Sequence, residues 1–437
     1  MSKKMNNIVA GELITSGWCP LNCTYCYIPK SEAMQKVHEE IEDDLRTGEF
    51  IRRLNRIYGK ELTHLGFWGT EPTLTLPLIE EYIPEILLTF PKLEEIGFST
   101  SLMAYPERIL HLIRSLLGRK LTLKIQISLD GPAFIVDVNR VKGTAKTVPK
   151  HFANLINEIN KLPLGDLRVV FSWKATHSIG NIRSFLEDPK RFDEYITYFD
   201  KLNRDFKQRN KQKNVTLRES QTPTLVVPGK YTSDDGKAFA EYLKGFAKGK
   251  KLTTYTHRLV RLFTWPDEVY KRRVFSCSGG DSNLGIGQSI HICHRTFYYD
   301  RDEYIESILS NPDIDNWDVS LFKRGTIDHI RKNYIVKGEP HFTRFKYVMR
   351  GYHDFWKFQL NQVKAMMIEL ALAGQVDPYY LENKGLLHLF ALFVNVALSC
   401  PMENLLNTGS IHLQLASMLR MFGNGAFQEI VRTAEVK

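Results

Sequence analysis

The sequence predicts an α/β protein in which parallel strands are joined by crossover helices. Apolar, strand-like runs alternate with amphipathic helical segments from Ile8 to Ala175, and this alternation is typical of parallel sheets. Polar and chemically reactive residues follow four strands in succession. Because ligands bind at the carboxyl ends of the strands in both α/β barrels and doubly wound sheets, we expect these residues to share one pocket. The alternation alone leaves both architectures open.

The expected elements follow from the spacing of apolar residues. Expected strands cover residues 8–15, 62–68, 95–102, 122–129 and 167–175, and a further strand is expected at 222–227. Expected helices cover residues 39–58, 76–88, 107–117, 151–162 and 234–246. Residues 200–217 are highly charged, so we expect a solvated helix or loop there.

Length and composition indicate a globular protein with a sizeable core, since the chain has 437 residues of which 43% are hydrophobic. We see no signal peptide, and the longest apolar run, residues 386–400, is too short to span a bilayer; we therefore expect a cytoplasmic protein without membrane contact. The net charge of +10 is interpreted as a solvated basic face. Residues 201–213 lack regularly spaced stacking aromatics, so a nucleic-acid partner is not expected.

Three thiols are clustered in the segment GWCPLNCTYCY, residues 17–27, directly after the first expected strand. Cys19, Cys23 and Cys26 have C-x3-C-x2-C spacing. Thiolates are ligands for zinc and for iron-sulfur clusters. Structural zinc requires four ligands, and no second pair follows nearby, whereas an iron-sulfur cluster held by three cysteines leaves one iron open to a small molecule. The spacing favours iron and leaves zinc as the alternative.

The cysteine spacing, with Tyr25 before the third cysteine, resembles the signature of the radical S-adenosylmethionine (AdoMet) superfamily. FWGTEP, which contains Gly69, Thr70 and Glu71, resembles the GGE(P) element that receives the methionine amino group, although Thr70 replaces the usual second glycine. ISLDGP, with Ser128 and Asp130, followed by Asn139 and Arg140, resembles the strand that meets the ribose and the methionine carboxylate. Singly, each segment could be an ordinary turn or helix start. The resemblance implies a partial (β/α)6 TIM-type barrel and AdoMet contacts at Tyr25, Gly69, Thr70, Glu71, Ser128, Asp130 and Arg140.

A second motif, CSGGDSNLGIGQSIHICHRTF, begins at Cys277 and resembles the first half of a SPASM or twitch domain, a β-hairpin whose thiols hold an auxiliary cluster. Gly287 lies one position too far from Cys293, and Cys400 is the one further thiol. One auxiliary iron-sulfur cluster held by Cys277, Cys293 and Cys400 is the preferred interpretation; two buried, unligated hairpin cysteines are the alternative. His294 could be a catalytic base, a metal ligand or a packed side chain.

These observations divide the chain into a barrel (1–235), a linker with a SPASM/twitch-like domain (236–345) and a helical C-terminal region (346–437). The resemblance implies a [4Fe-4S] cluster with an open iron that binds AdoMet, reductive cleavage to a 5′-deoxyadenosyl radical, and hydrogen abstraction from a substrate. We expect a closed, apolar barrel around this reaction, because it would exclude water and side reactions. The resemblance also implies a ferredoxin or flavodoxin electron donor. A peptide or protein side chain is the expected substrate; a small-molecule dehydrogenase or carbon-skeleton enzyme, or a metal-stabilised binding protein, are the alternatives.

Overall fold

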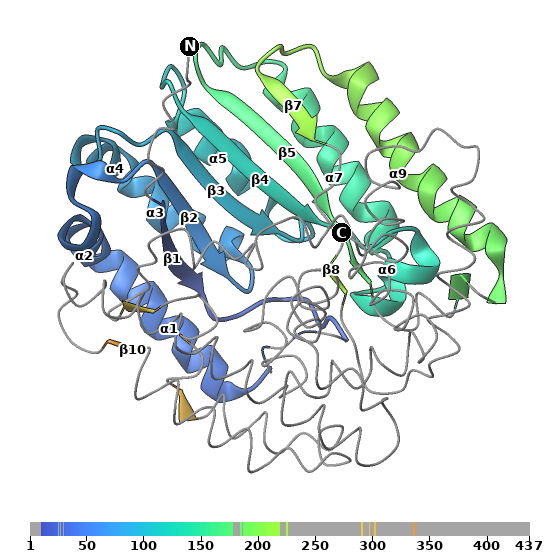
Figure 1. Cartoon of the computed structure of the whole chain (residues 1–437), viewed down its shortest axis with the longest axis horizontal. Helices are drawn as coiled ribbons and strands as arrows, with labels where there is room; N and C mark the ends of the chain where they lie inside the picture. Colours follow the sequence, from blue (N-terminus) through green and yellow to red (C-terminus); the bar gives the residue numbers. More distant parts are fainter. Residues whose placement is uncertain are drawn as a thin grey trace, which may run out of the picture.

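A six-stranded parallel sheet forms the centre of the described part of the chain (Figure 1). The computed structural model describes residues 10–24, 26, 28, 30–177, 184–185, 187–218, 224–225, 290–291, 297, 301–302 and 335–336. The strands of the sheet are β1 (Ala10–Ser16), β2 (His64–Gly69), β3 (Glu95–Thr100), β4 (Thr122–Ser128), β5 (Arg168–Lys174) and β7 (Val215–Arg218). Two short pairs lie outside it: β6 (Thr176–His177) with β8 (Thr224–Leu225), and β9 (Ile290–His291) with β10 (Ile335–Val336).

The strand order identifies the sheet as part of a barrel. Each strand of this sheet pairs in parallel with the strand of the sheet that follows it in sequence, in the order β1-β2-β3-β4-β5-β7. A doubly wound sheet reverses its strand order at a switch point, and this sheet does not reverse. Within the described residues β1 and β7 form its two edges, so the sheet is open. The predicted α/β class and the partial six-stranded barrel are therefore confirmed.

The helices form one layer that follows the strands. Contacts join α1 to α3, α3 to α5, α5 to α7 and α7 to α9, and Figure 1 shows α5 and α7 behind the sheet. Within the described residues, no helix has the length and apolar character needed to cross a membrane. The helices are α1 (Glu32–Thr47), α2 (Glu49–Tyr58), α3 (Leu76–Glu81), α4 (Ile83–Thr89), α5 (Pro106–Ser115), α6 (Ala133–Asn139), α7 (Thr144–Ile159) and α9 (Pro189–Arg209), with 3₁₀ turns η1 (Gly59–Glu61) and η2 (Pro72–Leu74).

The helix expected at 39–58 is two helices that meet at Gly48. This glycine has φ +69°, a left-handed conformation that ends a helix, and its N–H donates to the carbonyl of Leu45. At the other end of α1, the Ser31 side chain accepts a hydrogen bond from the amide of Met34 and caps the helix. Apolar periodicity continues across Gly48, which is why the sequence pattern shows one helix where the structure has two.

The sixth strand of the sheet was not predicted. Residues 200–217 were expected to be a solvated helix or loop, but α9 extends to Arg209 and β7 pairs with β5 through Val215 and Val169. Leu202 and Phe206 are buried between the charges of α9. A four-residue strand with two apolar residues is too short to show a clear alternation. The strand expected at 222–227 is the two-residue β8, which pairs with β6 outside the main sheet.

The two faces of the sheet differ in polarity. Side chains of β3 and β4 alternate between buried and half-buried positions, and the buried ones are apolar except for Thr100 at the end of β3. On the half-buried face, Ser99 donates to Gln126 at 2.8 Å, and Lys124 lies 2.5 Å from a carboxylate oxygen of Glu95. The expectation of a closed, apolar barrel interior is therefore wrong at these positions, because the strands carry polar residues at alternate places.

Candidate functional site

The cysteine loop begins where β1 ends and is held at its far side by α6. Cys19 and Cys23 are half-buried, Cys26 is exposed, and none of the three forms a disulfide. The amide of Cys26 donates to the carbonyl of Cys23 at 3.0 Å, and the amide of Thr24 donates to the carbonyl of Asn139 at 2.8 Å. The loop is therefore anchored to the segment that precedes Arg140, a predicted site residue 117 positions away from Cys23.

The electrostatic surroundings of the first two thiols differ. Burial, with a smaller contribution from the nearby Glu71 carboxylate, raises the pKa of Cys19 to about 12. Burial also raises the pKa of Cys23, while the guanidinium of Arg140 opposes this shift. Without a metal both thiols are therefore protonated at neutral pH, and a metal that binds them has to release their protons.

Asp130 and Arg140 form a buried ion pair beside the cysteine loop. The Asp130 side chain is fully buried, and it accepts hydrogen bonds from Nε and Nη2 of Arg140, both at 2.9 Å. The amide of Thr176 donates to the same carboxylate at 3.0 Å. Nη1 of Arg140 lies 3.9 Å from Sγ of Cys23. The pair thus connects the end of β4, the start of β6 and the second cysteine.

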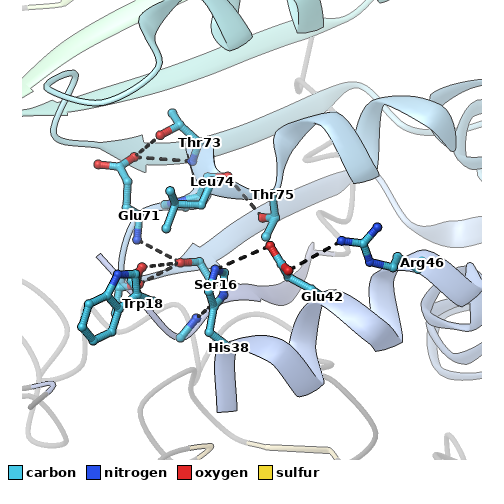
Figure 2. Close-up of polar contacts among 12 residues, drawn as sticks. Ser16, Trp18, His38, Glu42, Arg46, Glu71, Thr73, Leu74 and Thr75 are labelled. Carbon is cyan, nitrogen blue, oxygen red and sulfur yellow. Dashed lines mark hydrogen bonds and ion pairs between the residues drawn. The ribbon is translucent and has the colours of Figure 1, made fainter. Parts of the chain in front are cut away.

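Glu71 links the ends of β2 and β3. Its residue is 1% exposed. Oε1 accepts from the hydroxyl of Thr73 at 2.8 Å and from its amide at 3.4 Å, as Figure 2 shows. Oε2 accepts from the amide and the hydroxyl of Ser101, at 2.8 and 2.5 Å. A carboxylate has about four acceptor positions, and the chain's own donors occupy them. The structure therefore supports a role for Glu71 in joining the strand ends; contact with AdoMet stays a prediction.

Replacing Glu71 by Gln will destabilise this junction. The Gln side chain places an NH₂ group where one carboxylate oxygen of Glu71 accepts two hydrogen bonds. Because an NH₂ group cannot accept them, a backbone N–H of Thr73 or Ser101 loses its acceptor. An unsatisfied buried donor costs about 1–3 kcal/mol, which thermal unfolding of the metal-free protein will measure. Glu61, exposed and paired with Lys92, is the matched control, and its change to Gln should alter stability by no more than about 0.5 kcal/mol. Equal melting temperatures for the two variants would contradict this assignment.

Gly69 and Thr70 bring the end of β2 close to the end of β1. Gly69 has φ +143°, and a Cβ there would lie 2.2 Å from the carbonyl oxygen of Ser16, so no side chain fits. The Thr70 amide donates to that same carbonyl at 3.1 Å. The Thr70 hydroxyl contacts the Ser16 hydroxyl at 2.7 Å and donates to the carbonyl of Trp18. The first glycine of the motif is thus required by close approach, and the threonine side chain is directed toward the cysteine loop.

Sequence reasoning missed the side chains that hold the start of the loop. Ser16 donates to the carbonyl of Trp18 at 2.8 Å and accepts from the amide of Glu71 at 3.2 Å (Figure 2). Nδ1 of His38 accepts from the amide of Gly17 at 3.4 Å, and its Nε2 faces Glu42 at 3.7 Å. Burial lowers the pKa of His38, which favours the neutral form that can accept this bond. Serine and histidine outside a spaced motif give no sequence signal for such a role.

Ser128 is half-buried at the last position of β4, opposite Lys174 of β5. It belongs to the same alternating set as Gln126, so it lies on the polar face of the sheet. The remaining predicted site residues lie outside the described part of the chain. These are Tyr25, Cys277, Cys293, His294 and Cys400.

The donor chemistry of the loop fits an iron-sulfur cluster. Three sulfur donors share one loop, and the ionised forms of Cys23 and Cys26 raise the pKa of Cys19, so the thiols lie within electrostatic range of one another. Among the residues that the structure describes, no three His, Cys, Asp or Glu side chains are gathered closely enough to hold a metal ion. The fit therefore rests on the number and type of the donors, with Cys19, Cys23 and Cys26 as the residues that would hold the cluster.

The comparison with curated proteins found no match. Among solved structures, the chain is similar to anSMEcpe with bound AdoMet and Cp18Cys peptide, at 15% identity and a TM-score of 0.38 over 81% of this chain and 98% of that chain. It is also similar to Streptococcus suis SuiB bound to S-adenosylmethionine, at 15% identity and a TM-score of 0.29 over 78% of each chain.

A family model also matches part of the chain. It covers residues 13–165, described as the radical SAM superfamily. This range contains the three-cysteine loop, Glu71 at the end of β2, and the pair of Asp130 and Arg140. The chain therefore contains a radical SAM domain over residues 13–165, which supports an AdoMet-dependent enzyme.

Proposed function

We propose that this enzyme reductively cleaves AdoMet and uses the resulting radical to modify a peptide or protein side chain. The observation that carries the proposal is the arrangement of four strand ends around one loop. Ser16 and Thr70 join the ends of β1 and β2, Glu71 joins β2 to β3, and Asp130 joins β4 to β6. Polar groups at the carboxyl ends of successive parallel strands are the expected surroundings of a ligand site.

The proposed cofactor chemistry belongs to a [4Fe-4S] cluster and AdoMet. When bound, the reduced cluster would supply one electron to the sulfonium of AdoMet, which would yield methionine and a 5′-deoxyadenosyl radical able to abstract hydrogen from an unactivated carbon. The chain's part is to hold the cluster through Cys19, Cys23 and Cys26 and to orient AdoMet. Arg140, fixed by Asp130, is the proposed partner of the methionine carboxylate, and Gly69 and Ser128 are the proposed neighbours of the methionine amino group and ribose.

A peptide substrate is supported by the polar face of the sheet and by the second cysteine motif. Ser99 and Gln126 offer hydrogen-bonding groups on the half-buried face, and they suit the amide groups of a peptide. The sequence around Cys277 and Cys293 resembles the SPASM/twitch branch, which includes peptide-modifying enzymes. The proposed modifications are crosslinking, oxidation or epimerisation of a side chain.

Two further components belong to the proposal. An auxiliary cluster held by Cys277, Cys293 and Cys400 would lie in the C-terminal half, where His294 is a candidate base. The electron donor would be a ferredoxin or flavodoxin, whose acidic surface suits the net charge of +10.

Anaerobic reconstitution with iron and sulfide, followed by reduction in the presence of AdoMet, tests the proposal. We expect 5′-deoxyadenosine to accumulate, and we expect deuterium from a labelled peptide substrate to appear in it. Any short precursor peptide encoded next to this chain would be the first substrate to assay. Protein that binds zinc and never consumes AdoMet would contradict the enzymatic proposal. Deuterium transfer from small molecules but from no peptide would contradict the proposed substrate class.

A further inference from the structure

Thr70 occupies a position where the superfamily motif has glycine, and its side chain makes contacts that glycine cannot make. The hydroxyl donates to the carbonyl of Trp18 and lies 2.7 Å from the hydroxyl of Ser16. Trp18 directly precedes Cys19. The threonine therefore connects the end of β2 to the backbone that enters the first cysteine.

Hydrogen bonds hold the segment that leads into Cys19 at its first amide and at its last carbonyl. The amide of Gly17 donates to His38 of α1, and the carbonyl of Trp18 receives hydroxyl groups from Ser16 and Thr70. The hydroxyls of Ser16 and Thr70 have two protons between them, but they make three contacts that each require a proton. These contacts are Ser16 to Trp18, Thr70 to Trp18, and Ser16 to Thr70. The two hydroxyls thus form one hydrogen-bonding unit: either hydroxyl can donate to the carbonyl of Trp18 while the other hydroxyl donates to it.

We propose that Thr70 is a positioning residue for the cysteine loop, and that its hydroxyl sets the backbone before Cys19 in the geometry that retains the iron-sulfur cluster. This inference rests on the proposed function, because it assumes that Cys19 is a cluster ligand. Residues that orient metal ligands from outside the coordination sphere typically change metal affinity about 10–100-fold when replaced. Thr70 acts on Cys19 through the carbonyl of the preceding residue, Trp18, and needs no contact with the cluster.

The rate at which reconstituted protein loses iron to a chelator measures this role. In Thr70→Val, a methyl group replaces the hydroxyl against the oxygens of Ser16 and Trp18, so the loop has to shift, and we expect iron loss to accelerate about tenfold. Thr70→Ser keeps the hydroxyl and should stay within about twofold of the wild type. Thr70→Ala removes the hydroxyl without adding a methyl group there, and an acceleration of about threefold is expected from one lost hydrogen bond.

Thr15 provides the matched control. Its buried hydroxyl donates to the carbonyl of Trp68 in β2 at 3.0 Å and does not belong to the unit that holds Trp18. Thr15→Val makes the same chemical change one residue before Ser16, and its iron loss should stay within about twofold of the wild type. The electron paramagnetic resonance spectrum of the reduced cluster should change in Thr70→Val and remain unchanged in Thr15→Val, with both metal-free proteins folded by circular dichroism.

The outcomes separate this inference from the proposed function. Wild-type protein that takes up no iron and sulfide would overturn both. Wild-type protein that holds a cluster, together with a Thr70→Val variant that loses iron at the same rate, would overturn the positioning role alone. Equal acceleration in Thr15→Val and Thr70→Val would also overturn it, since the loss would then report a weakened sheet. If Thr70→Val does not fold, the comparison of Thr70→Ala with Thr70→Ser decides.

Discussion

Replacing any one of Cys19, Cys23 and Cys26 by Ala is expected to reduce 5′-deoxyadenosine formation to the level seen without protein. The three thiols share one loop, and each is needed because a cluster held by two protein ligands lacks a fixed site for AdoMet. The metal-free variants should remain folded, since Cys26 is exposed and the other two are half-buried at the edge of the sheet. Iron content, sulfide content and product formation measure the effect.

The C-terminal cysteines are the comparison set for this experiment. Combined replacement of Cys277, Cys293 and Cys400 should leave AdoMet cleavage in place. It should lower the iron content from about eight to about four atoms per chain if an auxiliary cluster is present, given ~4 iron atoms per cluster. An unchanged content of about four would show that these residues do not hold a cluster. Deoxyadenosine production by an N-terminal variant would remove the assignment of Cys19, Cys23 and Cys26.

The architecture could be predicted because its signals are local in the sequence. Strands of β-branched and aromatic residues alternate with amphipathic helices, and this pattern directly specifies parallel pairing. The strand β7 was missed because four residues with two apolar side chains carry too little pattern. The break at Gly48 was missed because helical periodicity continues on both sides of it, and only its positive φ reveals where α1 ends.

The candidate site was predictable where it uses spaced motifs and not where it uses single hydroxyl groups. The cysteine spacing identified the loop, and strand-end reasoning placed Glu71 and Asp130 beside it. Ser16 and His38 were missed because their partners are the backbone atoms of Trp18 and Gly17, and a backbone partner leaves no trace in the sequence. Ser101 directly follows β3, but its two bonds to Glu71 depend on the register between β2 and β3.

Replacing Arg140 by Met is expected to lower the free energy of unfolding by about 3–5 kcal/mol, because it leaves the fully buried carboxylate of Asp130 without its charged partner. This is a large share of the 5–15 kcal/mol that is typical of folded domains. Binding of AdoMet should weaken in the same variant, since the proposed bond to the methionine carboxylate is charge-assisted. A loss of about tenfold to a hundredfold corresponds to such a bond. Urea unfolding of metal-free protein and equilibrium AdoMet binding to reconstituted protein measure the two effects.

The double variant Asp130→Asn with Arg140→Met separates the structural role of Arg140 from its role toward AdoMet. Removing both charges eliminates the buried carboxylate that Arg140→Met leaves without the guanidinium, so most of the lost stability should return. AdoMet binding should stay weak, because the guanidinium is still absent. Arg140→Lys keeps a positive charge but loses the two-bond geometry toward Asp130, and it should fall between the wild type and Arg140→Met in both measurements. If the double variant regains AdoMet affinity together with stability, Arg140 acts through the fold alone and the proposed carboxylate contact is wrong.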